Sequence, residues 1–270
     1  MPSVSIPSAL SAAASLSVIV PTQTCVALVR GIEAKWAPIN IPLESLMAKP
    51  PSISINKLAE FMFAGTSRQR QILKDCKYPT DFKGMYYKEA DESISAAIAS
   101  NLEDLSKITN QIAILEQMSP EKLGTQRRIT SNIDALERFM GMVDDIDLKG
   151  SNPSHGTHAP QKLTFYGVSI SVRPQVLLKG EGKKGPVVGA LKLHFPRQYS
   201  LQDQSAGIVS AVLQEWCKAC LPDDGLAQGD MCCVIDVGAK KVFPGVRATA
   251  ARLKDVESAC QNIAALWPTI

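Results

Sequence analysis

The spacing of apolar residues changes once along this 270-residue chain, and that change limits the fold more than any other feature. Between residues 90 and 143 apolar side chains recur every three or four positions, as they do on packed helices. From residue 165 onward apolar and polar side chains alternate, as they do on strands with one polar face. The segment 148–161 between them is rich in Gly, Ser and Pro and follows neither period. We therefore predict an α+β protein with the helices first.

Three parts follow from this reading. Residues 1–54 are expected to hold a short helix at 23–36 and a connector with several prolines. Residues 55–147 form a helical region, in which Gly65 interrupts the first stretch. Residues 162–270 form an α/β core, so the boundary lies in 148–161.

The apolar spacing from Ala90 to about Glu116 predicts one long helix. Ser119 and Pro120 are typical of a new helix start, with Ser as the N-cap and Pro at the first position, and this second helix should run to about Val143. The two form a helical hairpin. It is either an arm that binds a partner or dimerises, or an antiparallel pair packed on the rest of the protein, which we favour.

The C-terminal part predicts a strand over 165–178, a turn at 180–185 and a second strand over 185–195. Ser200 to Asp203 resembles a capping box and opens a helix. The apolar run 231–237 suits a buried strand, and a last helix ends the chain. The order is strand, strand, helix, strand, helix. On the second strand Val188, Ala190, Lys192 and His194 share one face.

Composition excludes several classes of protein. An apolar content of 45% supports a core and argues against disorder, and no run is long enough to span a membrane. The net charge of +3 is too small for a dedicated electrostatic nucleic-acid binder. The apolar opening has no charged residue before Arg30, unlike a signal peptide, and seven cysteines are an odd set that suits reduced thiols. We expect a cytoplasmic protein.

The cysteines and histidines do not suggest a metal site. Cys217 and Cys220 have a zinc-like spacing, but Cys232 and Cys233 are adjacent on a strand and point to opposite faces. His155 and His158 lie beside Gly and Pro with no third ligand nearby. The chain also lacks a Walker loop, a dinucleotide glycine motif and a nucleophile elbow, and this argues against a kinase, a dehydrogenase or a hydrolase.

The order of elements, with VSISVRPQVLL as first strand and VVGALKLHF as second, resembles the core of the PD-(D/E)XK nuclease superfamily over roughly 55–80 and 163–267. In that superfamily an acid on the first motif strand and an acid-x-Lys on the next hold Mg²⁺, and a preceding helix often adds a Glu. The resemblance implies a restriction-endonuclease-like mixed sheet flanked by helices. It places Gln175 at the first acid, Ala190 and Lys192 at acid-x-Lys, and Glu60 at the helix acid. Gln204 lies where RecB-like members often carry a Gln.

Two of these positions are neutral here. Magnesium sites are built from carboxylates, whereas Gln175 offers only a carbonyl oxygen and Ala190 offers no ligand. Without a metal, Lys192 can only hold a phosphate or stabilise negative charge, and it is otherwise an ordinary lysine on a solvent-facing strand. The contacts expected for nucleic acid are Arg173, His194, Gln204, Arg68 and Lys74.

We therefore favour a nucleic-acid-associated protein with replaced catalytic acids, a binding or assembly component like those of bacterial phage-defence and mobile-element systems. One alternative is an active nuclease with Glu60, Gln175, Lys192 and Glu181 around Mg²⁺. Another is a protein-binding module in which the hairpin contacts a protein partner or a second copy of the chain.

Overall fold

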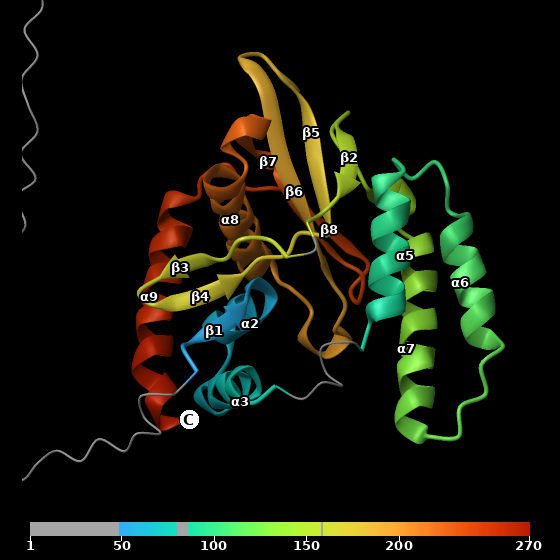
Figure 1. The fold of residues 1–270 in the computed structure, drawn as a ribbon, viewed down its shortest axis with the longest axis horizontal. Helices are drawn as coiled ribbons and strands as arrows, with labels where there is room; N and C mark the ends of the chain where they lie inside the picture. Colours follow the sequence, from blue (N-terminus) through green and yellow to red (C-terminus); the bar gives the residue numbers. More distant parts are fainter. Residues whose placement is uncertain (1–48, 80–85, 158) are drawn as a thin grey trace, which may run out of the picture. The chain divides into compact units, whose positions relative to one another are not determined.

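The computed structural model describes residues 49–79, 86–157 and 159–270, all within one compact unit that spans 48–270. The helix expected at 23–36 lies outside these residues. The unit contains helices and two sheets, which confirms the α+β prediction (Figure 1). No helix in the described ranges is both long and apolar enough to cross a membrane.

The larger sheet has five strands, in the order β2-β5-β6-β7-β8, which is also their order along the chain. Strands β6 and β7 are parallel, and the other three neighbouring pairs are antiparallel. The parallel pair is joined by helix α8 (Asp203–Cys220), whose first turn is fixed by the Ser205 hydroxyl accepting from the Gln202 N–H. The strands are β2 (Asn152–His155), β5 (Val176–Gly182), β6 (Gly185–His194), β7 (Leu226–Asp236) and β8 (Lys241–Phe243).

A smaller sheet has the order β1-β4-β3, with β1 parallel and β3 antiparallel to β4. Its strands are β1 (Ser52–Ser54), β3 (Leu163–Phe165) and β4 (Val168–Ser171). Single helical turns lie at Val143–Asp145, Arg197–Tyr199, Pro222–Asp224 and Trp267–Thr269.

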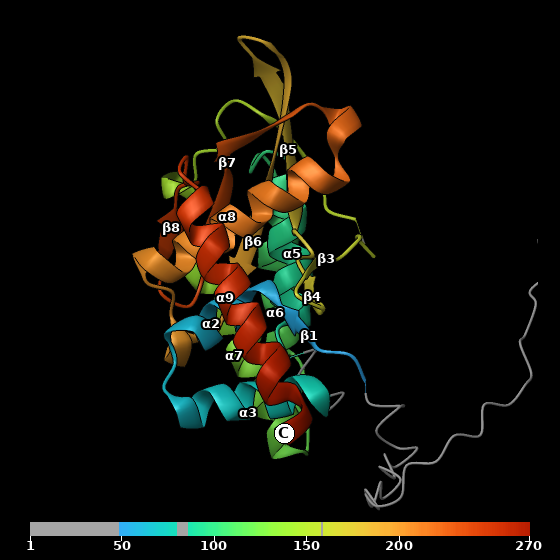
Figure 2. The same ribbon diagram turned by 90° about the vertical axis from the view of Figure 1, so that its left-hand side faces the viewer.

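The five-stranded sheet separates two apolar cores, because successive side chains on a strand point to opposite faces. Val188 and Ala190 of β6 enter the first core, whereas Leu191 and Leu193 enter the second. The first core includes side chains from α2 (Ile55–Phe63), α3 (Thr66–Lys77), α8 and α9 (Ala250–Leu266). The second lies under α5 (Lys88–Ala99), α6 (Ser106–Glu116) and α7 (Leu123–Met140). Figure 1 shows α9 and α7 on opposite sides of the sheet, and Figure 2 looks onto α9.

The prediction of one long helix from Ala90 to Glu116 is wrong. The chain leaves α5 through Asn101 and Leu102, both in the left-handed backbone region, with φ of 60° and 61°. Asp104 then accepts a hydrogen bond from the Ser106 N–H at 2.9 Å and starts α6. The apolar spacing continues across this break because Leu102 and Leu105 still pack on the second core. The next helix, α7, begins at Leu123 rather than at Ser119.

The prediction of one strand over 165–178 is also wrong, because β4 and β5 belong to different sheets. Between them Arg173 has a φ of 42°, a conformation that L-residues rarely adopt, and Pro174 follows it. The chain changes direction there and moves from one sheet to the other. Strand β2 lies inside the segment 148–161, where the sequence suggested a boundary.

The second strand, the helix after it and the buried strand occur as expected. The β5–β6 hairpin turns at residues 183–184, and Cys232 and Cys233 enter opposite cores as their adjacency predicted. The expected capping box at Ser200 and Asp203 is shifted, and Gln202 with Ser205 caps α8 instead. The buried side of α9 carries Val256, Cys260 and Ile263.

Candidate functional site

Lys192 lies near the end of β6 on the face of the first core and is only 8% exposed. Its Nζ donates a hydrogen bond of 2.6 Å to the backbone carbonyl of Arg173, in the connection between β4 and β5. Lys192 is therefore not an ordinary lysine on a solvent-facing strand, which was one of the interpretations of the sequence. Its ammonium group holds the left-handed turn at Arg173 in place.

Gln175 lies beside Lys192 and directly precedes β5 in the chain. Its backbone N–H donates to Leu191 O at 3.0 Å, and its side-chain Oε1 accepts from Leu193 N, also at 3.0 Å. The amide thus continues the ladder of the sheet by one step beyond the strand. Its Nε2 donates to Asp91 Oδ1 at 2.9 Å, so the same side chain ties β6 to helix α5.

Asp91 is the acid that the sequence reasoning missed. It lies in the first turn of α5, the helix that precedes the five-stranded sheet in the chain and covers one of its faces. The signal was present, because Asp91 lies three positions before Ile94 and seven before Ile98 on a buried stripe. An acid on an apolar stripe is unusual unless it has a partner inside the protein. We call Asp91, Gln175 and Lys192 the Lys192 cluster.

Burial shifts the two charged groups of the Lys192 cluster toward their neutral forms. The pKa of Lys192 is lowered to about 8, mainly by desolvation; the charge of Asp91 opposes this shift and the charge of Arg173 adds to it. Desolvation likewise raises the pKa of Asp91, while Lys192 and the Gln175 hydrogen bond oppose that rise. Each group thus partly stabilises the charge of the other inside a poorly solvated site.

Glu60 is not part of this cluster. It lies on α2, and its carboxylate is held by Lys57 Nζ at 2.6 Å and by Arg68 Nη2 at 2.5 Å. Arg68 also lies over the ring of Tyr199, 4.1 Å from its centroid. The helix acid that reaches Gln175 is therefore Asp91 instead of Glu60, and Arg68 is engaged with protein groups.

Glu181 lies far from the cluster. It pairs with Pro186 near the turn of the β5–β6 hairpin, six residues along β5 from Gln175, or roughly 20 Å at the usual rise of a strand. An exposed acid at that distance cannot share a metal ion with Lys192's neighbours. The structure thus separates Glu181 from the site in which the nuclease hypothesis placed it.

His194 is buried, with 4% of its surface exposed, and its Nε2 lies 2.8 Å from the carbonyl oxygen of Tyr199. Burial lowers its pKa, while Asp236, its neighbour on β7, opposes that shift. Its Nδ1 is also buried and has no hydrogen-bond partner among the described residues. His194 therefore anchors the loop after β6 and does not face solvent.

The remaining expected nucleic-acid contacts are exposed but dispersed. Arg173 lies next to the Lys192 cluster, in the connection between β4 and β5. Gln204 lies in the first turn of α8 and Lys74 in the last turn of α3. In the part of the chain that the structure describes, no three His, Cys, Asp or Glu side chains come together as metal ligands.

Cys217 and Cys232 form a hydrogen bond between their thiols, which together with burial raises the pKa of Cys217.

The site therefore brings together one carboxylate, one amide and one lysine, from a helix and two adjacent strands. Hard cations such as Mg²⁺ are held by several oxygen ligands, of which carboxylates supply the charge. Asp91 alone offers such a charge here, and its Oδ1 already accepts from Gln175. No family model and no curated protein matches the sequence.

Proposed function

We propose that this chain is a nucleic-acid-associated protein whose nuclease-type core binds or assembles but does not cut. The observation that carries the proposal is the Lys192 cluster: a helix acid, a polar residue at the start of one strand and a lysine on the next. Gln175 and Lys192 are positions that the resemblance to PD-(D/E)XK nucleases implies, and Asp91 is a helix acid beside them where the resemblance had assigned Glu60. A mixed sheet with helices on both faces supports the same resemblance.

The chemistry of the cluster argues against phosphodiester hydrolysis. Metal-assisted hydrolysis needs a cation that activates water and contacts the phosphate. The two positions that would add carboxylates hold Gln175 and Ala190, and Ala190 is fully buried among apolar side chains. Lys192 donates to a backbone carbonyl instead of pointing to solvent. The protein would require Mg²⁺ only if it were an active nuclease.

The first experiment asks whether the protein cuts DNA. Purified protein is incubated with plasmid and single-stranded DNA in Mg²⁺ or Mn²⁺, beside Asp91→Asn and Lys192→Met variants that are shown to be folded. We expect no cleavage, or cleavage that survives in both variants and so comes from a contaminant. Cleavage that both variants abolish would overturn the proposal and establish an active nuclease.

The second experiment asks whether the protein binds nucleic acid at all. Phosphate contacts release counterions, so the affinity for DNA should fall steeply as salt is added. Binding at low salt that weakens in this way supports the proposal. No retention of single- or double-stranded nucleic acid at low salt would refute it. A role in phage defence or in a mobile element remains a prediction from the resemblance.

A second candidate function is protein binding through the helices. Ile114 and Met118 near the end of α6 and Leu123 at the start of α7 are each about half exposed, close together in the chain. Light scattering of the intact protein over a range of concentrations tests self-association. A molecular mass that rises above that of the monomer in the wild-type protein, and stays at the monomer mass in Met118→Asp, would favour this candidate.

A further inference from the structure

Two adjoining hollows lie along one side of α7. The first has a volume of about 440 Å³ and is lined by Tyr86, Leu123, Gln126, Arg127, Thr130 and Ser131. The second has about 480 Å³ and lies between α7 and the loop after β6, which contributes Arg197 and Tyr199. Thr130 and Ser131 line both hollows, so the two adjoin each other. We call them together the α7 groove.

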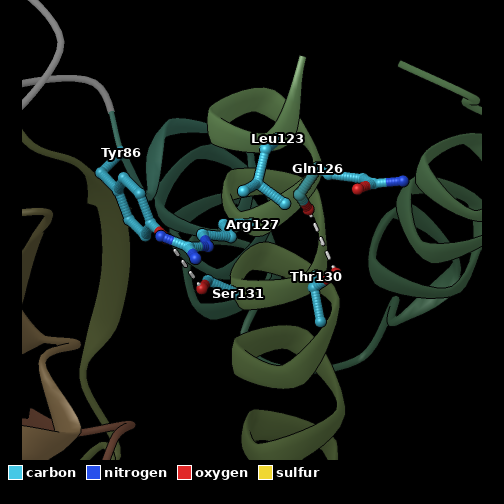
Figure 3. A pocket seen from close by; sticks show the side chains of 6 residues that line it. All are labelled: Tyr86, Leu123, Gln126, Arg127, Thr130 and Ser131. Carbon is cyan, nitrogen blue, oxygen red and sulfur yellow. Dashed lines mark hydrogen bonds between the residues drawn. The ribbon is translucent and has the colours of Figure 1, made fainter. Parts of the chain in front are cut away.

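The lining of the α7 groove is aromatic. Three of the five tyrosines of the chain, Tyr86, Tyr87 and Tyr199, line it. Tyr86 and Tyr87 meet edge to face, and the Tyr86 hydroxyl lies 3.2 Å from Ser131 Oγ. Figure 3 shows Arg127 and Tyr86 extending toward each other on the same side of the helix. Aromatic rings in such a hollow offer stacking surfaces to planar ligands.

The groove is also cationic. Arg127 is exposed and forms no ion pair with any described residue. Arg197 is 64% exposed at the other end, and its closest carboxylate, Asp134, lies 3.8 Å away and is shared with Arg138. Asp134 is the single acid among the lining residues. Two arginines near opposite ends of the groove suit a ligand with repeated negative charges.

The groove adjoins the second core next to the end of β6, the strand that carries Lys192. Tyr87 stacks on Phe195, with ring centroids 5.1 Å apart, and Phe195 directly follows β6. His194, the last residue of β6, holds the carbonyl oxygen of Tyr199 on the far wall. The groove wall is thus fixed by the strand on which Lys192 lies.

From this geometry we propose that the α7 groove binds single-stranded nucleic acid, which rests on the function proposed above and names its substrate class. Each hollow has the size of a small-ligand site, which fits an unstacked nucleotide. A duplex keeps its bases stacked inside and offers aromatic side chains little to stack on. Phe195 covers one face of the Tyr87 ring and Arg68 covers one face of the Tyr199 ring, so bases stack on the opposite faces of these rings and beside Tyr86. Arg127 and Arg197 contact phosphates, as in other sequence-tolerant single-strand sites.

The test measures fluorescence anisotropy of labelled oligo-dT, oligo-rU and a DNA duplex, each of about 16 residues, against the full chain. We expect single strands to bind more tightly than the duplex, and the two single-strand arms distinguish DNA from RNA. Arg127→Glu should weaken single-strand binding by roughly threefold to tenfold and reduce the salt slope by about 0.7, because one phosphate contact is lost. Arg127→Lys, which keeps the charge, should restore most of the affinity.

Two controls separate the groove from nonspecific charge and from misfolding. Lys254→Glu reverses an exposed charge on α9, on the opposite side of the sheet, and should leave binding unchanged. Tyr86→Leu should weaken binding by roughly 5-fold to 100-fold, whereas Tyr86→Phe keeps the ring and should not. The thermal unfolding of each variant is recorded beside its binding curve.

The outcomes distinguish this inference from the proposed function. If the wild-type protein binds but Arg127→Glu and Lys254→Glu have the same effect, or the duplex binds more tightly than both single strands, the groove is not the site while the proposed function stands. If the wild-type protein binds none of the three at low salt, both proposals fail. Loss of single-strand affinity in Arg127→Glu and Tyr86→Leu, but not in Lys254→Glu or Tyr86→Phe, supports the α7 groove as the binding site.

Discussion

The Lys192 cluster and the α7 groove hold their cations in opposite ways. Lys192 is almost fully buried, and its ammonium group is bound by a backbone carbonyl. Arg127 is exposed beside a hollow and pairs with no acid in the described parts of the chain. A cation whose hydrogen bonds are satisfied inside the protein stabilises the fold, whereas one at the surface remains available to a ligand. The sequence motif drew attention to the first, but the structure offers the second for binding.

The largest expected effect comes from Gln175→Leu. This change leaves Leu193 N–H without its side-chain acceptor and Asp91 without its amide donor in a poorly solvated site. We expect the free energy of unfolding to fall by about 2–4 kcal/mol, measured by urea denaturation. The matched control is Gln204→Leu on the exposed first turn of α8. Equal losses in the two variants would show that the cluster has no structural role.

The next effect is a pH dependence that belongs to Lys192. Its native pKa of about 8 lies below the 10.5 that is usual for an exposed lysine, so the unfolded chain binds more protons between these limits. The contribution of Lys192 to the free energy of unfolding should therefore rise with pH in that window, by roughly 1.4 kcal/mol per pH unit where the difference in bound protons is complete. Lys192→Met should lack this rise.

Denaturation of the wild-type protein and of Lys192→Met between about pH 7.5 and 10 would check this pH dependence, because that range covers most of the window. Lys184→Met, at the exposed turn of the β5–β6 hairpin, is the matched control and should retain the wild-type slope. Parallel curves for wild-type protein and Lys192→Met would contradict the buried position of the ammonium group.

A smaller effect is expected at the turn above Lys192. Arg173 has a φ of 42°, which glycine adopts without strain. Arg173→Gly should raise the free energy of unfolding by about 0.5–1 kcal/mol. Because the charge of Arg173 lowers the native pKa of Lys192, the same variant should also raise the lower limit of the pH window. A clear destabilisation would mean that contacts of the Arg173 side chain outweigh the relief of strain.

The smallest effect completes the contrast. Arg127→Ala removes an exposed side chain, and we expect the free energy of unfolding to change by less than about 0.5 kcal/mol. Urea curves that superimpose on the wild type, together with weaker single-strand binding, would separate binding from stability. A loss as large as that of Gln175→Leu would show that Arg127 supports the fold.

Much of the fold was predictable because local spacing decides it. The β5–β6 hairpin, α8, β7 and α9 follow from alternation or from helical periodicity around one buried face. Three features were not predictable. Strand β2 is short and mostly exposed, and its pairing with β5 defines it. The breaks at Asn101 and Arg173 depend on left-handed backbone turns, while the apolar spacing runs on through them.

The site was predictable only where the hairpin register decides it. A hairpin that turns at 183–184 necessarily brings Gln175 beside Leu191 and Lys192, and the structure has this register. The choice of acid could not be decided in the same way. Local spacing marks Asp91 as an acid on a buried stripe, but it does not show the contact with Gln175, 84 residues away, which forms because α5 packs on the second core. Glu60 and Glu181 matched in residue type but not in position.

The four-residue link from Val172 to Gln175 also bears on how this protein can diverge. It joins two sheets, and the residue at its end both pairs with β6 and contacts α5. Inserting or deleting one residue there would turn the amide of Gln175 to the other face of the sheet and remove both contacts at once. Homologous chains should therefore tolerate length changes in the hairpin turn at 183–184 far more readily than in this link.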